Sequence, residues 1–476
     1  MIRRLIGVVS ASAVLSGCID LAPTYHRPIQ PTPPSFPSGP AYAAATRVTP
    51  VVPWRDFFVD AKLRALIDEA LANNRDLRVA VANIAISRGQ YGVQRSDQFP
   101  KLNAQASATY GQFPAGVGSR QGGGGGGGSG SSVYNGRLYS VNGAVSAFQL
   151  DLFGKQRNLT RAAFEQYLST KAARDAAQIT LISEVASDAL TLGANRALLA
   201  VARQAVVNGD ATLALVKARF QGGIASELDV FQAATFSEQA RSDVARLTTQ
   251  VAQDRNVLEL VVGAPVPDGA LPGGVDDPGV AVANLPGGLP SSALLARPDV
   301  VQAEDVLRGA NADIGAARAA FFPSISLTGS GGVTSLALAT LFRASSETWT
   351  FIPQISQPIF DFGANKGNLR VARGQRDADL ARYEKTVQTA FREVADALAR
   401  RGTIDAQLAA QRALNTAAAG NLKLSTARYE RGADTYLNEL VAQRTFYAAQ
   451  QSLIATQLVD ATNLVALYTS LGGGAR

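Results

Sequence analysis

The chain contains one sequence pattern twice, and this internal repeat limits the folds that it can adopt. A shift of 209 positions places Phe153-Gly154 on Phe362-Gly363 and Gly263 on Gly472, with no gap over 111 residues. A shift of 223 positions aligns the segments that come before, including the Phe-Pro pairs at 99–100 and 322–323. We therefore expect two copies of one unit, each made of helix, strand, loop, strand and helical hairpin.

Two long stretches without proline predict the helical hairpins. No proline occurs between Lys155 and Ala264 or after Pro358, and both stretches are rich in alanine with helical spacing of their apolar residues. Gly222-Gly223 interrupts the first stretch and Gly432 the second, which indicates a turn in each. Each stretch therefore predicts two very long antiparallel helices, and a helix of ~60 residues is about 90 Å long.

The last helical stretch carries two lines of residues spaced seven apart. The apolar line predicts a supercoiled seam and consists of Leu440, Tyr447, Ile454, Ala461 and Tyr468. The polar line is interpreted as solvated surface or, alternatively, as a wall facing water inside a tube, and consists of Gln443, Gln450 and Gln457.

Segments with a period of two residues predict four strands. Apolar and polar residues alternate over 102–110, over 139–152 with a change of parity near Phe148, and again over 324–328, while 349–360 is the expected last strand. The change of parity predicts a bulge or a boundary. Segments 102–110 and 319–342 contain no charged residue, as membrane strands require, because a charge facing lipid at mid-bilayer costs ~2–4 kcal/mol.

Four strands cannot close a barrel around a pore, so several chains are expected to share one. A soluble β-sandwich flanked by helices is the alternative, but it leaves the uncharged strands unexplained.

The beginning of the chain predicts a lipoprotein signal peptide. Arg3 and Arg4 precede a short apolar run over 5–15, which is too short to span a bilayer as a helix. Leu15-Ser16-Gly17-Cys18 resembles a bacterial lipobox, which implies cleavage before Cys18 and acylation of that residue. Ile19 after the cysteine favours export to the outer membrane by resemblance to lipoprotein sorting rules; the alternative is a buried cysteine present by chance.

Composition excludes most catalytic classes. The chain has one His, one Cys and one Met, so one chain cannot form a Cys/His metal site, a Ser-His-Asp triad or a disulfide framework. It has no phosphate loop with Gly-Lys-Ser/Thr, and the glycine run 122–128 lies between two strands with no helix after it. Basic residues interleaved with aromatic residues are absent, so nucleic-acid binding is not expected. The sequence predicts no enzyme, no metal and no cofactor beyond the lipid on Cys18.

The expected organisation has five parts: a signal peptide (1–17), an acylated cysteine with an extended tether (18–53), a first repeat (54–264), a linker (265–295) and a second repeat (296–476). The first repeat holds helices, two strands and a long helical hairpin. The second holds a helix, two strands and a long helical hairpin.

Ten short motifs, in their order along the chain, resemble the outer-membrane factors of tripartite efflux systems, the TolC-like channels of the NodT lipoprotein branch. They are Leu15-Ser16-Gly17-Cys18, Trp54 with Phe57-Phe58, the segment 70–78, Phe99-Pro100, the segment 150–154, Arg297-Pro298-Asp299-Val300, Phe321-Phe322-Pro323, the segment 357–361, Arg428-Tyr429 with Gly432, and the tail 471–474.

This resemblance implies a fold and a role. The fold is mainly α with membrane β: a homotrimer in which each chain gives four strands to one shared outer-membrane β-barrel, while long helical hairpins form a periplasmic α-barrel. The role is a passive, gated conduit that carries small molecules, such as drugs or other toxic compounds, from the periplasm to the outside. The implied partners are outer-membrane lipids, a periplasmic adaptor protein and an inner-membrane pump of the RND type.

The resemblance also gives the hairpin turns a role as periplasmic gate or adaptor-docking site. Val441 stands where an Asp is expected in such channels, so a carboxylate ring there is in doubt. Ordinary turn chemistry is the alternative, with Ser226 or Thr435 capping the next helix. The predicted tip residues are Arg219, Gly223, Leu228, Asp229, Arg428, Gly432, Asp434, Leu437, Asn438, Glu439 and Arg444.

Two other functions remain as alternatives at this point. A periplasmic adaptor lipoprotein bridging the two membranes also uses helical hairpins, but adaptors carry one hairpin between β-rich halves, by resemblance, whereas this chain has two. An envelope hydrolase is disfavoured because the chain lacks a usable His.

Overall fold

The structure is a computed structural model that describes residues 19–42, 53–114, 133–272 and 290–473. Cys18, the predicted signal peptide and the glycine run 122–128 lie outside the described residues. The chain divides into two compact units. We call them the sheet unit (Met1–Arg27, Ile86–Tyr167 and Asp305–Asp379) and the hairpin unit (Pro28–Ala85, Leu168–Glu304 and Leu380–Arg476).

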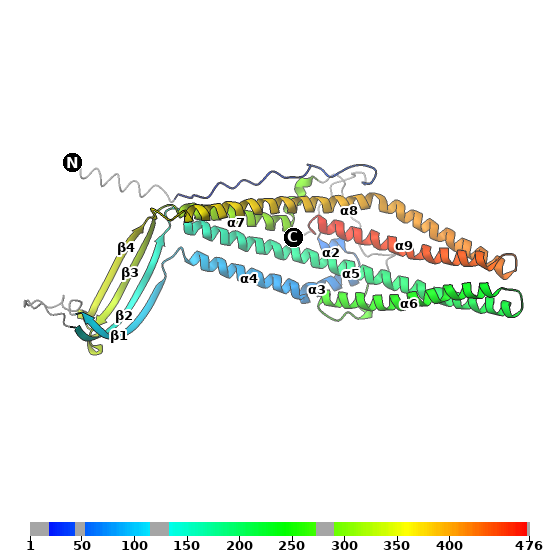
Figure 1. The fold of residues 1–476 in the computed structure, drawn as a ribbon, viewed down its shortest axis with the longest axis horizontal. Helices are drawn as coiled ribbons and strands as arrows, with labels where there is room; N and C mark the ends of the chain where they lie inside the picture. The colour runs from blue at the N-terminus through cyan, green and yellow to red at the C-terminus, as the bar shows by residue number, and fades with distance from the viewer. Residues whose placement is uncertain (1–18, 43–52, 115–132, 273–289, 474–476) are drawn as a thin grey trace, which may run out of the picture. The chain divides into compact units, whose positions relative to one another are not determined.

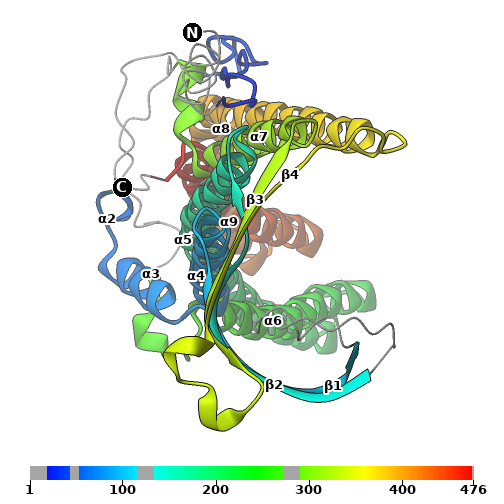
Figure 2. The ribbon, with the colours of Figure 1, turned by 90° about the vertical axis from the view of Figure 1, so that its left-hand side faces the viewer.

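The sheet unit contains four antiparallel strands in the order β1-β2-β3-β4 (Figure 1). The strands are β1 (Leu102–Pro114), β2 (Val133–Leu150), β3 (Ser324–Ser335) and β4 (Glu347–Ser356). Figure 2 shows them as one curved sheet, with the short helices η3 (Leu338–Thr340) and η4 (Ala344–Ser346) between β3 and β4. The four predicted strands are confirmed, although the last one ends at Ser356 rather than at Phe360.

Both predicted hairpins are present. The first consists of α5 (Lys155–Gln221) and α6 (Glu227–Val262), and the second of α8 (Ala364–Glu430) and α9 (Tyr436–Ser470). Helices α5 and α8 have 67 residues each, whereas α6 has 36 and α9 has 35. The second helix of each hairpin is thus shorter than the ~60 residues that the sequence led us to expect.

A glycine explains where α6 stops. Gly263 ends this helix in the left-handed conformation, with φ 77°. A Cβ atom there would lie 2.8 Å from the carbonyl oxygen of Asn73, so the backbones meet where only glycine fits.

An aromatic cluster closes the core of the hairpin unit. Helices α2 (Trp54–Phe57) and α3 (Ala61–Asn73) place Phe57 and Phe58 against Tyr468 of α9, with 4.4 Å between the stacked rings of Phe57 and Tyr468. All three side chains are fully buried, and such aromatic pairs contribute beyond the area that they bury. The predicted seam is confirmed at Leu440, Ala461 and Tyr468, which are all buried.

The chain passes from α3 to the next helix at 73–74. The side chain of Asn74 caps α4 (Arg75–Ser96) by accepting from the Leu77 N–H at 2.8 Å, and it donates to the carbonyl of Val261 at 2.8 Å. The remaining elements are η1 (Asp268–Ala270), η2 (Ser291–Ala296) and α7 (Pro298–Ala319). Within the described part of the chain, no helix combines the length and the apolar character needed to cross a bilayer.

Candidate functional site

One face of the sheet is polar across all four strands. Residues directly opposite each other in antiparallel strands share a face. Ser107 of β1 pairs with Ser140 of β2, Ser140 pairs with Thr334 of β3, and Ser330 of β3 pairs with Thr350 of β4. The hydroxyls of Ser107 and Ser140 lie 2.8 Å apart, and those of Ser330 and Thr350 lie 3.1 Å apart. The alternation predicted strand by strand therefore adds up to one continuous polar surface.

The opposite face is apolar. It carries Ala106 opposite Val141, Val141 opposite Val333, and on β4 the side chains of Trp349 and Phe351, of which Trp349 is 81 % exposed. An exposed aromatic band of this kind is unfavourable in water and matches the apolar outer face of membrane strands.

A bulge keeps β2 on the correct face. The register of β2 against β3 shifts between Val145 and Phe148, so that Phe148 pairs with Leu327 and Leu150 with Ile325. Without the extra residue these apolar side chains would point to the polar face, because a shift of one residue reverses every side chain. The predicted change of parity near Phe148 is therefore a bulge and not a boundary.

The two hairpin tips have the same backbone turn. Gly223 and Gly432 adopt φ of 73° and 70°, and their N–H groups donate to the carbonyls of Phe220 and Tyr429, each at 2.9 Å. These positive φ values favour glycine, which accounts for both turn signals in the sequence.

The first tip reaches the second through Arg219. Its guanidinium donates to the carbonyls of Tyr429 and Glu430 at 3.0 and 2.9 Å, and it lies 4.3 Å from the centre of the Tyr429 ring. Ser226 begins α6 with a reciprocal capping box, in which Asp229 accepts from the Ser226 N–H at 2.9 Å. Asp229 thus serves as a cap within its own tip.

The second tip is centred on Asp434. Its carboxylate accepts from Asn438 Nδ2 at 2.6 Å, from the Thr435 N–H at 2.9 Å and from Arg428 Nε at 3.0 Å. These hydrogen bonds, first that of Asn438, hold the pKa of Asp434 below its usual range. The Thr435 side chain makes no capping hydrogen bond, so the expectation that it caps α9 is wrong. Its own backbone N–H donates to the neighbouring Asp434 carboxylate.

The other predicted tip residues differ in exposure. Leu228 and Leu437 are 63 % and 51 % exposed, and Val441 and Arg444 are also exposed. Glu439, by contrast, is 3 % exposed: its Oε1 accepts from Thr426 Oγ1 at 3.2 Å. Burial raises the pKa of its carboxyl.

Sequence spacing did not identify the neighbours of Glu439. Gln443 lies beside it, with Nε2 3.4 Å from Glu439 Oε1 and 3.0 Å from Thr212 Oγ1 of α5. The interpretation of the glutamine line as solvated surface is therefore wrong for Gln443, which is buried. The heptad spacing marked this residue, whereas no pattern in the sequence marks Thr212 as its partner.

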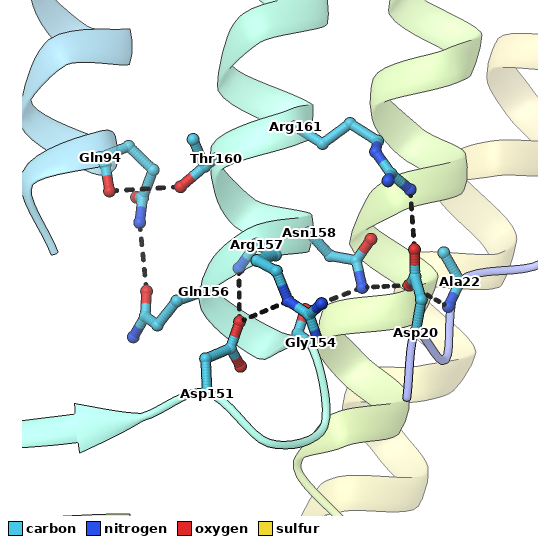
Figure 3. A network of polar contacts seen from close by, with 10 residues as sticks. All are labelled: Asp20, Ala22, Gln94, Asp151, Gly154, Gln156, Arg157, Asn158, Thr160 and Arg161. Atoms are coloured by element: carbon cyan, nitrogen blue, oxygen red, sulfur yellow. Dashed lines mark hydrogen bonds and ion pairs between the residues drawn. The ribbon is translucent and has the colours of Figure 1, made fainter. Parts of the chain in front are cut away.

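The segment that follows Cys18 is fixed to the sheet unit (Figure 3). Asp20 accepts from Asn158 Nδ2 at 2.8 Å and from Arg161 Nη1 at 3.0 Å, both on α5. Arg318 of α7 donates to the carbonyl of Leu21 at 3.0 Å, and the Ile19 N–H donates to the carbonyl of Leu152 at 3.2 Å.

These contacts place residue 19 beside the end of β2. They were not foreseen from the sequence, where 18–53 was described only as a tether. The one sequence feature that could have indicated these contacts is Asp20, a charged residue two positions after the cysteine.

Comparisons with known proteins agree on one family. The family described as "Outer membrane efflux protein" matches residues 66–264 and 289–473. The chain is 42% identical over 478 residues to the probable efflux pump outer membrane protein TtgC of Pseudomonas putida, covering 100% of this chain and 96% of TtgC. It is 40% identical to the outer membrane protein OprJ of Pseudomonas aeruginosa, covering 97% and 94% of the two chains.

Solved structures agree as well. The MtrE outer membrane channel of Neisseria gonorrhoeae in its open state matches with a TM-score of 0.83 and 35% identity, over 96% of this chain and 99% of that chain. A structure of CusC matches with a TM-score of 0.83 and 37% identity, over 96% and 100%.

The matches extend over nearly the whole chain and include both repeats. The fold is that of TolC-like channels, mostly helical with four strands per chain, and the role is that of a channel rather than an enzyme. The chain belongs to the outer membrane efflux protein family and is an outer-membrane channel component of an efflux pump.

Proposed function

We propose that this chain is one third of a homotrimeric conduit, with three chains each giving four strands to a single barrel. The two faces of the sheet carry this proposal: the polar face would line water and the apolar face would contact lipid. The sheet of each chain also has two edge strands, β1 and β4, whose outer backbone groups cannot remain unpaired in lipid. Pairing β4 of one chain with β1 of the next satisfies both edges.

The helical hairpins extend the conduit into the periplasm. Their tips, with the exposed Leu228 and Leu437, form the gate and the surface that docks a periplasmic adaptor. The energy for transport comes from an inner-membrane pump of the RND type, since the chain has no nucleotide-binding loop. The two repeats, 54–264 and 296–476, supply equivalent parts of the wall.

The mature chain is anchored by acylation of Cys18 after removal of residues 1–17. A single acyl chain binds membranes only marginally, so a multiply acylated cysteine is the effective form. The fixed position of residue 19 beside the end of β2 supports this assignment, because it brings the anchor to the end of a membrane strand. Mass spectrometry of the purified protein and of Cys18→Ala tests it: acyl mass on the wild type alone is expected, and an unacylated wild type contradicts it.

The cargo belongs to the same classes as that of the relatives. Their names include a toluene efflux pump, a solvent efflux pump and an antibiotic efflux pump. We therefore propose organic solvents and antibiotics as the substrates that the pump passes to this channel. Deleting the gene and measuring susceptibility to both classes tests this, and unchanged susceptibility to both would contradict it.

Single-channel conductance tests the conduit itself. Purified trimers in a planar bilayer are expected to conduct, and a variant with loosened tips is expected to conduct more. A monomer that stays soluble, or trimers that never conduct in either form, would overturn the proposal.

A further inference from the structure

The four helices of the two hairpins enclose a cavity near the tips. Its volume is about 380 Å³, and its walls include Thr212 of α5, Phe236 of α6, Leu422 of α8 and Tyr447 of α9. This volume lies within the range of small-molecule sites, about 300–1,000 Å³. All four wall segments belong to the hairpin unit, so the cavity is a feature of a single compact unit.

Two buried oxygen atoms of residues that line this cavity have no hydrogen-bond partner among the described residues. They are Oε2 of Glu439 and Oε1 of Gln443, whose side chains both line the cavity. Both residues are more than nine-tenths buried. A buried acceptor without a donor costs about 1–3 kcal/mol, so the site requires N–H or O–H donors. Because both unpartnered atoms are hydrogen-bond acceptors, a ligand that binds them must carry hydrogen-bond donors.

Charge around Glu439 favours a positive ligand. None of the ion pairs between described residues includes Glu439. Arg219 of α5 attracts the charge of Glu439, but its guanidinium donates to backbone carbonyls. Glu430 of α8 repels the charge of Glu439. Tyr436 of α9 is close to Glu439 and to Asp229 of α6. An ionised carboxylate buried in this way is stabilised by a proton or by a cation in contact with it.

The rest of the wall indicates what kind of cation fits. The rings of Phe236 and Tyr447 lie edge to face with centres 6.2 Å apart, and Leu422 adds an aliphatic surface. Aromatic faces attract organic cations. A divalent metal is a poor match, because Ca²⁺ takes 6–8 oxygen ligands and the cavity supplies few carboxylates. No described group of three or more acidic, His or Cys residues could hold a metal.

We propose that this cavity binds a small organic compound with a primary ammonium group. Glu439 is its counter-ion, the Gln443 carbonyl is a second acceptor, and the rings of Phe236 and Tyr447 contact its apolar part. All residues that line the site belong to one chain, so the proposal extends the proposed function and does not depend on it.

Calorimetric titration of the full-length protein in detergent tests this proposal. The probe is phenethylammonium, and 2-phenylethanol is its neutral counterpart of similar size. We expect saturable binding of phenethylammonium alone. Because burial raises the pKa of Glu439, binding should tighten as the pH rises above the usual range of a Glu carboxyl and the proton is lost.

Matched variants locate the site. Glu439→Gln should weaken binding at least tenfold, whereas Glu227→Gln removes an equal charge from the exposed first turn of α6 and should leave binding unchanged. Leu422→Trp narrows the cavity and keeps Glu439, so it should also weaken binding. This variant tests the proposal if Glu439→Gln does not assemble. Equal binding of the two probes, no binding to the wild type, or wild-type affinity in Glu439→Gln or Leu422→Trp would overturn the proposal.

Discussion

The tips of the two hairpins are two copies of one turn within a single chain, so they can be compared residue by residue. Positions 209 residues apart correspond, and the left-handed glycines Gly223 and Gly432 occupy the same place with nearly the same φ. The backbone hydrogen bonds correspond too: the Ile224 N–H donates to the Arg219 carbonyl at 2.8 Å, and the Ala433 N–H donates to the Arg428 carbonyl at 2.9 Å. The turn itself is therefore common to both repeats.

The side chains at corresponding positions do different things. Arg219 crosses to the other hairpin, whereas its counterpart Arg428 binds Asp434 in its own tip. Glu439 corresponds to Val230, so only the second tip buries a carboxylate. A turn that depends on backbone conformation needs only a glycine, while the surrounding side chains are free to acquire separate roles.

The largest expected effect comes from removing the contact between the tips. Arg219→Ala loses two charged hydrogen bonds and a cation–π contact, and it leaves two carbonyls of the second tip without this donor. Hydrogen bonds to charged groups contribute about 1.5–3 kcal/mol when shielded, and partial exposure places this case near the lower end, at about 2 kcal/mol in total. Hydrogen exchange at 424–440 should accelerate, and single-channel conductance should increase.

Arg428→Ala is the control for that experiment. It removes the same side chain at the corresponding position but breaks contacts only within the second tip. If both variants loosen the second hairpin equally, the difference between the tips has no energetic consequence.

The second prediction converts one tip toward the other. Glu439→Val introduces the residue of the first tip and removes a buried oxygen that lacks a partner. It also removes the oxygen that accepts from Thr426 and Gln443, so the net stabilisation should be about 1 kcal/mol at pH 8 without added amine. The sign depends on pH. Because the folded pKa is raised, the wild type loses stability as the pH rises from the usual Glu range toward the raised pKa.

Thermal unfolding between pH 4 and pH 8 measures this difference. The Tm of the wild type should fall relative to that of Glu439→Val as the pH rises. A constant difference in Tm across that range would show that the carboxyl of Glu439 titrates normally.

The same comparison shows what the sequence can predict. Periods of two residues and long stretches without proline predicted the strands and hairpins, because backbone geometry repeats along the chain at fixed intervals. The change of parity at Phe148 predicted the bulge for the same reason. Gly222-Gly223 and Gly432 predicted the turns, because positive φ favours one residue type.

Contacts between distant segments were not predictable in this way. Arg219 and Tyr429 are 210 positions apart, and no local pattern shows that the guanidinium crosses between the hairpins while its counterpart does not. The burial of Glu439 likewise depends on the packing of helices from both repeats. The sequence therefore predicts the positions of the tips well, but it does not predict the partners of their side chains.

The third prediction separates the two helix starts. Ser226→Ala removes the hydroxyl of a complete capping box and should cost about 1 kcal/mol. Thr435→Ala, at the corresponding position, should cost only a few tenths, because that hydroxyl makes no capping bond. Urea unfolding of both variants measures the difference, and equal losses would show that the caps are alike in solution.

The smallest effect is expected at Asp434, which is half-buried and whose partner Arg428 is exposed and screened by water. Asp434→Asn keeps the size of the side chain but removes the charge that binds Arg428 and Asn438. Since these hydrogen bonds lower the pKa of Asp434, their contribution should persist in the wild type down to the usual Asp range and disappear only as the pH falls through the depressed pKa. Hydrogen exchange of residues 431–438 should therefore differ between the two proteins at pH 6 and converge under strongly acidic conditions. The free-energy difference at pH 6 should be smaller than the loss caused by Ser226→Ala. Exchange that already converges near pH 5 would mean that the second tip does not hold this carboxylate in its ionised form.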